Sequence, residues 1–148
     1  MNQVWIENNG ITALQAAAQY GHHEVVLLLI KRGADVSRAD ALGRTPMHCA
    51  AQYGHAGTVS LLHTHGANVN AVDEDGLSPL HTAAQYGHAA TISLLIGIGG
   101  NLNLQNKMGR TVLIAAVQYG HAGTAKLLLD RKADINLGDT KVSLPALA

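Results

Sequence analysis

Histidine is the residue type with which this sequence could most readily do chemistry, because nine of its 148 residues are histidines. A neutral imidazole binds metal ions, and it gains or loses a proton near neutral pH. Four of the nine recur at one place in a repeated segment, namely His22, His55, His88 and His121. Their equal spacing predicts a row of rings along an elongated molecule.

This histidine row does not favour a shared metal ion. Packed helices lie roughly 8–10 Å apart, whereas a ligand nitrogen lies about 2.0–2.1 Å from Zn²⁺. Neither a cysteine nor a pair of carboxylates accompanies the row. His63 and His65 are two residues apart, so on a helix their rings point to different faces. We therefore predict structural histidines, no metal site and no cofactor.

A nucleophile is equally hard to find. Cys49 is the only cysteine, so no disulfide can form within the chain. It occupies a position held by Ala16, Thr82 and Ala115 in the other copies of the repeated segment, which predicts a small core residue. The chain has no Gly-x-Ser-x-Gly, phosphate-loop or His-Glu-x-x-His pattern. We predict no catalytic residues and no enzyme activity.

The elements that position these residues follow from a period. The segment Gln-Tyr-Gly-His begins at Gln19, Gln52, Gln85 and Gln118, so the interval is 33 residues each time (52 − 19, 85 − 52, 118 − 85). A fixed period of this size indicates a solenoid, in which each unit packs only on its neighbours.

Each unit reads as two short helices. Pro46 and Pro79 stand where a first helix would begin, since proline is tolerated at the first helical position. Gly54 and its equivalents would end that helix in a left-handed conformation. Asp or Asn followed three residues later by Gly, as in Asp73–Gly76, is typical of a type I turn at a projecting hairpin tip. Such short helices need stacking to be stable. We predict an all-α repeat solenoid of stacked helix–turn–helix units.

The segments Thr45–Ala50 and Ser78–Ala83 resemble the Thr-Pro-Leu-His-x-Ala signature of the ankyrin repeat. Gly33–Val36 and Gly66–Asn70 resemble the Gly-Ala-Asp-Val-Asn segment of that family. The resemblance implies L-shaped units with projecting β-hairpin turns, a concave groove formed by first helices and hairpins, and protein recognition. It also implies that His48 and His81 hydrogen-bond to the Thr or Ser hydroxyl.

The resemblance divides the chain into units of 33 residues within one domain, 1–148. The repeats span about 10–42, 43–75, 76–108 and 109–141, and 142–148 is the truncated start of a fifth unit in which Pro145 keeps the register.

The end repeats depart from the signature, as end repeats usually do. The first has Ala13 and Gln15 in place of Pro and His, and the fourth has Val112 and Ile114 there. Lys132 stands at a glycine position of the fourth repeat, which we expect to fray first.

Leu27 takes the place held by Ser60, Ser93 and Lys126 in the other repeats. This apolar residue suggests cover from residues 1–9 with Trp5 as the candidate, a partner, or a missing repeat.

All four tyrosines, Tyr20, Tyr53, Tyr86 and Tyr119, hold the same place at the end of the first helix. By family analogy this place borders the concave groove, where tyrosine is a favoured binding residue. Together with Gln52 and Gln85, the tyrosines form one half of the predicted partner-binding surface. The alternative is that the rings only pack on neighbouring repeats.

The turn tips supply the other half, because they vary while the frame stays constant. The predicted partner-binding residues there are Leu42, Arg44, Glu74, Asp75, Leu77, Lys107, Met108 and Arg110. An acidic third tip and a basic fourth tip would orient a partner of complementary charge. The alternative is unconstrained drift on solvated loops.

Asn70, Asn103 and Asn136 each end a pair of the Val-Asn type, with a leucine eight residues earlier. Similar asparagines of ankyrin repeats can be hydroxylated, so the resemblance implies possible modification sites. The ordinary alternative is a buried asparagine that caps a turn.

Charge and composition bound the partners. Ten basic and ten acidic residues balance, which argues against nucleic acid or an anionic membrane surface as the main partner. A single cysteine, no signal-peptide pattern and no apolar run longer than Val25–Ile30 predict a cytoplasmic or nuclear protein that is not secreted.

We therefore expect a non-catalytic scaffold that binds another protein. The alternative is the docking arm of a larger enzyme or effector. The expected state is a monomer, with end-to-end self-association through uncapped ends as a further possibility.

Overall fold

The structure is a computed structural model that describes residues 10–138. These residues contain eight α-helices and no β-strand, which confirms the predicted all-α solenoid. Trp5, Pro145 and the incomplete fifth unit 142–148 lie outside the described residues.

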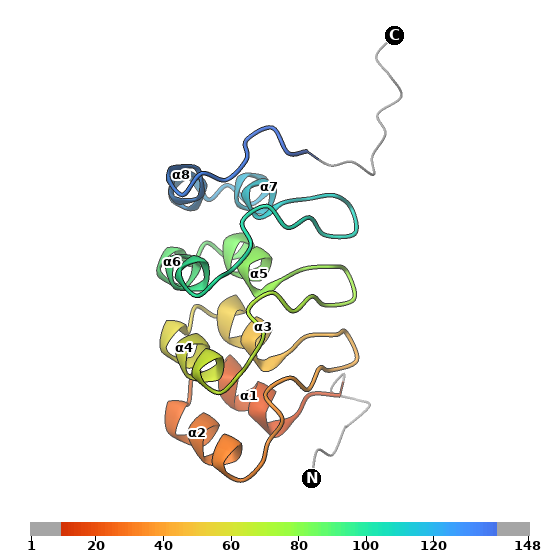
Figure 1. Cartoon of the computed structure of the whole chain (residues 1–148), viewed down its shortest axis with the longest axis vertical. Helices are drawn as coiled ribbons and strands as arrows, with labels where there is room; N and C mark the ends of the chain where they lie inside the picture. Colours follow the sequence, from red (N-terminus) through yellow and green to blue (C-terminus); the bar gives the residue numbers. More distant parts are fainter. Residues whose placement is uncertain (1–9, 139–148) are drawn as a thin grey trace.

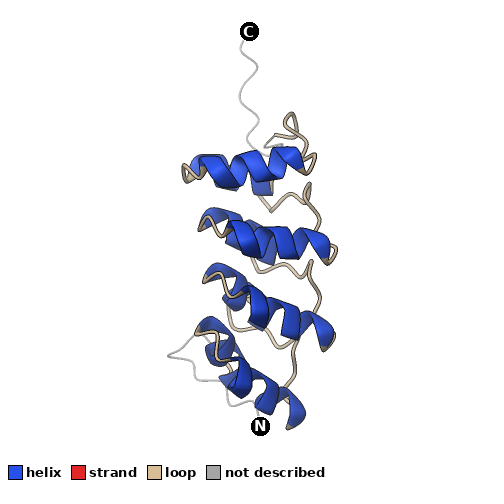
Figure 2. Cartoon of the chain, turned by 90° about the vertical axis from the view of Figure 1, so that its left-hand side faces the viewer, coloured by secondary structure: helices blue, strands red, loops and turns tan. Residues whose placement is uncertain are grey.

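The helices form two columns. The inner helices are α1 (Ala13–Gln19), α3 (Pro46–Gln52), α5 (Pro79–Gln85) and α7 (Val112–Gln118). The outer helices are α2 (His23–Lys31), α4 (Ala56–Thr64), α6 (Ala89–Gly97) and α8 (Ala122–Asp130). Figure 1 shows the outer helices on the left, the inner helices in the middle and the loops projecting to the right. Each pair packs on the next pair in chain order, and Figure 2 shows the resulting four-layered stack.

A hydroxyl residue starts every inner helix. Thr45 caps α3 in an extended conformation, and its side chain accepts a hydrogen bond from the His48 N–H. Pro46 follows at the first helical position, as predicted. The helix ends at Tyr53, and Gly54 then adopts a left-handed φ of 72° that turns the chain toward the outer helix.

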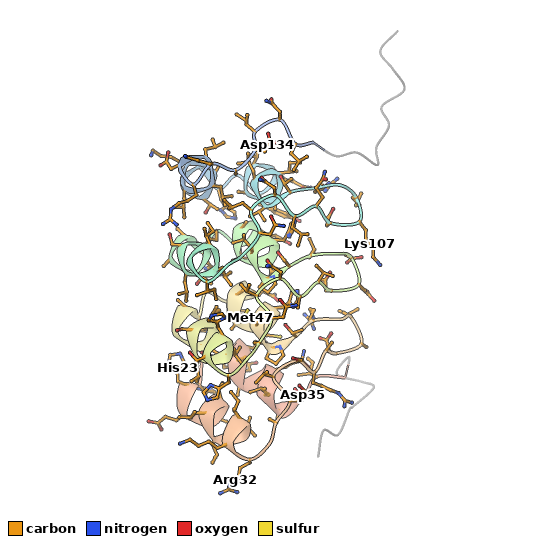
Figure 3. All side chains as sticks on the ribbon, viewed as in Figure 1. His23, Arg32, Asp35, Met47, Lys107 and Asp134 are labelled. Atoms are coloured by element: carbon orange, nitrogen blue, oxygen red, sulfur yellow. The ribbon has the colours of Figure 1, made fainter. Side chains whose placement is uncertain are left out.

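The core lies between the two columns and runs along the whole stack. Met47 and Leu80 of the inner helices and Leu62 and Leu95 of the outer helices are fully buried. Figure 3 shows Met47 inside the stack, between neighbouring helices. The short side chains of the inner helices let one layer approach the next closely.

Cys49 belongs to this core, as predicted. Its thiol is free and buried, and burial raises its pKa to about 11. A thiol with such a pKa stays protonated near neutral pH, which makes it a poor nucleophile.

The projecting loops are hairpin-shaped turns without strand pairing among residues 10–138. In each loop a backbone hydrogen bond joins the two sides, as in the Asp73 N–H that donates to the Leu77 carbonyl at 2.9 Å. The predicted turn is present, because the Gly76 N–H donates to the Asp73 carbonyl at 3.0 Å.

Within residues 10–138, the helices are too short to cross a lipid bilayer.

Candidate functional site

The buried histidines of the inner helices have structural roles. The Nδ1 of His48 accepts a hydrogen bond from the Thr45 N–H at 3.1 Å and lies 2.9 Å from the Thr45 hydroxyl. Since Nδ1 accepts, the proton is on Nε2, which donates to the Leu77 carbonyl at 2.8 Å. His81 repeats this arrangement with Ser78 and with the Arg110 carbonyl. Burial lowers the pKa of both histidines, which favours the neutral ring that these bonds require.

The repeated histidine row joins one repeat to the next. The Nε2 of His55 is 2.9 Å from the Gln19 carbonyl oxygen, and that of His88 is 2.7 Å from the Gln52 carbonyl oxygen. His121 makes the same contact with Gln85 at 2.8 Å. Each imidazole thereby satisfies a carbonyl at the end of an inner helix, a group that has no partner within its own helix. We call this contact the histidine joint.

The histidine joint depends on a glycine. A Cβ atom added to Gly21 would lie 2.6 Å from the Nδ1 of His55, and Gly54 and Gly87 stand equally close to the next ring. No group of three or more His, Cys, Asp or Glu side chains in the described part of the chain is arranged to hold a metal ion. The contact between repeats therefore explains why these histidines recur every 33 residues.

The turns are held in register by their first residue. Oδ1 of Asp40 accepts hydrogen bonds from the Leu42 and Arg44 N–H groups, both at 2.9 Å. Asp73 and Asn106 cap the next two turns in the same way. The side chain thus fixes the loop, and the tip residues remain available for contacts outside it.

Adjacent tips are also bonded to each other. The Glu74 N–H donates to the Leu42 carbonyl at 3.0 Å, and the Lys107 N–H donates to the Asp75 carbonyl at 3.0 Å. We call the three linked tips, residues 41–42, 74–75 and 107–108, the tip strip. Because only main-chain atoms make these links, the side chains of the tip strip can vary without breaking it.

A groove with a volume of about 290 Å³ lies between the last two tips and the inner helices α5 and α7. It is lined by Asp75, Leu77, His81, Gln85, Asn106, Lys107, Met108, Arg110, Thr111, Ala115, Gln118 and Tyr119. Seven of the predicted partner-binding residues are therefore brought together here. Figure 3 shows Lys107 at the far end of its projecting loop, away from the helical columns.

The two arginines that follow tips behave differently. Arg44 pairs with Asp40 of its own turn, with Nη2 and Oδ2 2.8 Å apart. In the next turn but one the capping residue is the neutral Asn106, and the Nη1 of Arg110 donates to Oε1 of Gln118 at 3.0 Å. Gln118 also lines the groove, so this bond joins the turn to the inner helix α7.

The tyrosine row is partly open to solvent in every repeat. The exposed fractions are 65% for Tyr20, 47% for Tyr53, 48% for Tyr86 and 52% for Tyr119. Tyr119 lines the groove, and the Tyr86 hydroxyl lies 3.5 Å from Nε2 of Gln52. Each ring therefore has both a packed and a free side, and its role in binding stays a prediction.

Other predicted residues lie outside this groove. Leu42 and Glu74 are exposed on the tip strip, while Gln52 and Tyr53 belong to the inner face of the second repeat. The groove also contains Gln118, which the sequence pattern of the Gln-Tyr pairs could have identified. Asn106 stands at the first place of a turn in the sequence, and nothing in its spacing indicates that it faces the groove.

The three asparagines are more open than a buried turn cap would be. Asn70 is half-buried, and it bridges repeats by donating to the Gly99 carbonyl at 3.0 Å and accepting from the Asn101 N–H at 2.9 Å. Asn103 and Asn136 are exposed, and Oδ1 of Asn103 accepts from the Asp134 N–H. Hydroxylation of these residues stays a prediction.

Two comparisons with known proteins agree with this geometry. A family model of ankyrin repeats in three copies matches residues 1–73 and 57–139. The ankyrin repeat-containing protein P1E11.10 of Schizosaccharomyces pombe is 40% identical over 40 residues, which are 27% of this chain and 19% of that protein. The match thus covers less than a fifth of the length of this relative.

Proposed function

The chain belongs to the ankyrin-repeat family, and on that premise we propose that it is a non-catalytic scaffold that holds a partner protein in its groove. Ankyrin repeats are in general protein–protein interaction modules. The observation that carries the proposal is the groove between α5, α7 and the last two tips, because it gathers polar, charged and aromatic groups on a rigid frame.

The groove and the tip strip also suggest the chemistry of the partner. Glu74 and Asp75 form an acidic end, and Lys107 forms a basic end one repeat further along. A partner segment with a basic residue followed by an acidic one, spaced across one repeat, would meet both with opposite charge. Tyr119 and Met108 offer apolar contact between and beside these charges.

The experiment compares three forms of the immobilised chain against lysate from its source. They are the wild type, the triple variant Lys107→Ala/Met108→Ala/Tyr119→Ala, whose three residues line the groove, and a matched control, His63→Ala, which changes an exposed residue of the outer helix α4. We expect proteins that the wild type and the control both retain to be depleted at least about tenfold by the triple variant, since removing an interface hot spot costs about 2 kcal/mol or more.

Binding of an identified partner is then measured by calorimetry with Glu74→Lys/Asp75→Lys, with circular dichroism to check that each variant is folded. Loss of affinity that weakens at high salt would support the assigned charges. Equal recovery of every protein by all three immobilised forms contradicts the proposed surface.

A docking arm of a larger enzyme or effector would use the same surface. Sequencing the transcript on both sides of the segment distinguishes this alternative, because stop codons on both sides would leave no larger protein for the arm to serve.

A further inference from the structure

The last repeat presents to its outer side residues that the internal repeats bury against a neighbour. Val117 of α7 is 64% exposed, whereas Ala51 and Ala84 at the same repeat position are fully buried. Ile135 is 70% exposed, whereas Val69 at its position is 9% exposed. We call this surface the trailing face; its residues are Val117, Gly120, Leu129 and Ile135.

The first described repeat presents the opposite surface. Val25 of α2 is 45% exposed, whereas Thr58 and Thr91 at the same position are 0% and 1% exposed. We call this surface the leading face; its residues are Ala13, His22, Val25 and Leu28. Both faces carry a larger apolar residue where internal repeats have Ala or Thr, although the outer face of a capping repeat is normally polar.

Each face also holds one half of a histidine joint. The Gln118 carbonyl, equivalent to those of Gln19, Gln52 and Gln85, has no hydrogen-bond partner within residues 10–138. No atom lies within 4 Å of a Cβ atom added to Gly120, whereas a histidine ring lies next to each of the three earlier glycines, Gly21, Gly54 and Gly87. Among the described residues, the imidazole of His22 reaches no carbonyl and stacks instead on Tyr20, with ring centroids 6.1 Å apart.

The two faces are also matched in size. Inside the stack, the bulky His23 lies against Gly57, where a Cβ atom would be 2.5 Å from the ring. At a joint between the two end faces, the residues at those positions are Ala122 and Glu24, so the small residue now belongs to the preceding repeat and the large one to the following repeat. The larger Val117 would meet an inner helix in which Ala13 replaces the proline of internal repeats.

We propose that the trailing face of one chain binds the leading face of a second copy, with His22 of the second copy donating to the Gln118 carbonyl of the first. The contact continues the joint that already links the repeats inside the chain. Because the two faces differ, the contact is heterologous, and successive copies extend the stack head to tail.

The test uses sedimentation velocity of the whole 148-residue chain over a wide range of concentration. We expect the average mass of the wild type to rise with concentration. Val117→Glu and Val25→Glu each place a charge on one face, and both should remain at the mass of one chain. Since Val117 is 64% and Val25 45% exposed, a charge at either place can reach solvent and neither change should unfold the chain.

The decisive measurement is an equimolar mixture of the two variants. Each retains the face that the other has lost, so the mixture should form a two-chain complex that does not grow further. His22→Ala should weaken wild-type association about fivefold, as expected for one hydrogen bond, and the tip variant Lys107→Ala should leave association unchanged.

A wild type that stays at the mass of one chain at every concentration overturns the proposal. Association of Val117→Glu alone to the wild-type extent does so too, because it would mean that identical faces pair. A chain ending at Gly138 that associates when the full chain does not would show that residues 139–148 occupy the trailing face instead. Partner binding at the tip strip is not tested by these results, so the two proposals can fail separately.

Discussion

Repeats 3 and 4 have the same frame but differ in what supports it. In repeat 3, Pro79 begins the inner helix, and His81 bonds both to Ser78 and to the Arg110 carbonyl of the next repeat. Repeat 4 has Val112 and Ile114 at these places, so its inner helix begins without proline, and the half-buried side chain of Ile114 can make no hydrogen bond. Even so, α5 and α7 have equal lengths, as do α6 and α8.

The difference between the two repeats indicates that the form of a repeat and its stability depend on different residues. Repeat 4 keeps its two helices without the proline, the histidine or the second glycine of the signature, so stacking on repeat 3 is sufficient to define its form. The signature residues therefore act mainly by strengthening a joint that the period already specifies. Repeat 4 also has a described neighbour on one side only, which leaves it with fewer supporting contacts.

The largest effect on the free energy of unfolding should come from shortening a core leucine at the same position of the two repeats. Leu80→Ala in repeat 3 removes a fully buried side chain and should lower the free energy of unfolding by about 3 kcal/mol. Leu113→Ala should lower it less, because we expect repeat 4 to open before the rest and to lose its contacts early. Urea unfolding followed by circular dichroism measures both values.

Hydrogen exchange of the wild type provides the companion measurement. The amides of α7 and α8 should exchange faster than those of α3 and α5. Slowest exchange in repeat 4 would reverse the comparison on which this prediction rests.

The next effect concerns Lys132, which has a left-handed φ of 68°. This conformation costs an L residue with a side chain about 1–2 kcal/mol, a cost that glycine avoids. Lys132→Gly should therefore stabilise repeat 4 by about 1 kcal/mol, measured as slower exchange of the α8 amides.

Gly99 of repeat 3 is the matched control. Its φ is 106°, and the nearest atom to an added Cβ is 3.9 Å away, so Gly99→Lys tests backbone strain without a steric clash. The reverse substitution should destabilise repeat 3. If Lys132→Gly and Gly99→Lys both raise or both lower the stability of their repeat, backbone conformation is not the cause of the effect.

The third effect is a pH dependence confined to repeats 2 and 3. Burial lowers the folded-state pKa of His48 and His81 below the ordinary 6.5. The unfolded chain therefore binds protons first, and stability is lost as pH falls below about 6.5 toward the folded-state pKa. Above 6.5 this contribution is fully present. Urea midpoints measured from pH 8 down to pH 5 should decline accordingly.

Repeat 1 supplies the control for this titration. Gln15 occupies the histidine position there, accepting from the Thr12 N–H at 3.1 Å and donating to the Arg44 carbonyl at 2.8 Å. In the double variant His48→Gln/His81→Gln, the new glutamines should make the hydrogen bonds that Gln15 makes in repeat 1. The urea midpoint should then depend less on pH. An unchanged slope would assign the pH dependence to other groups.

The smallest effect should come from Lys126 on the outer side of repeat 4. Its Nζ lies 2.7 Å from Oδ2 of Asp130, but both side chains are mostly exposed. Solvent screens such a pair, so Lys126→Ala should leave the urea midpoint within experimental error. A clear loss of stability would mean that this exposed ion pair contributes to the stability of repeat 4.

Much of the fold could be predicted because the period and the helix signals agree. Pro46, Gly54 and the Asp73–Gly76 turn each act locally, so a single repeat already defines where its helices begin and end. Cys49 could be assigned to the core for a similar reason, because the other repeats have the small residues Ala16, Thr82 and Ala115 at its position.

The contacts between repeats were beyond such local reasoning. The bond from His55 to the Gln19 carbonyl spans 36 residues and ends on a main-chain atom, which no side-chain pattern reveals. The resemblance implies β-hairpin turns, but the projecting loops contain no strand pairing within residues 10–138. The bond from Nη1 of Arg110 to Oε1 of Gln118 joins a turn to an inner helix, and this contact appears only in three dimensions.

The histidine joint has a consequence for how such genes change length. Its acceptor is a main-chain carbonyl, so any unit that ends its inner helix at the same place and keeps the glycine two residues later can receive the next histidine. Unequal recombination that removes one whole unit would bring His88 to the Gln19 carbonyl and recreate the joint that His55 makes there. Insertion of a unit works in the same way, so the repeat number can drift by whole units while the tips of each copy diverge independently.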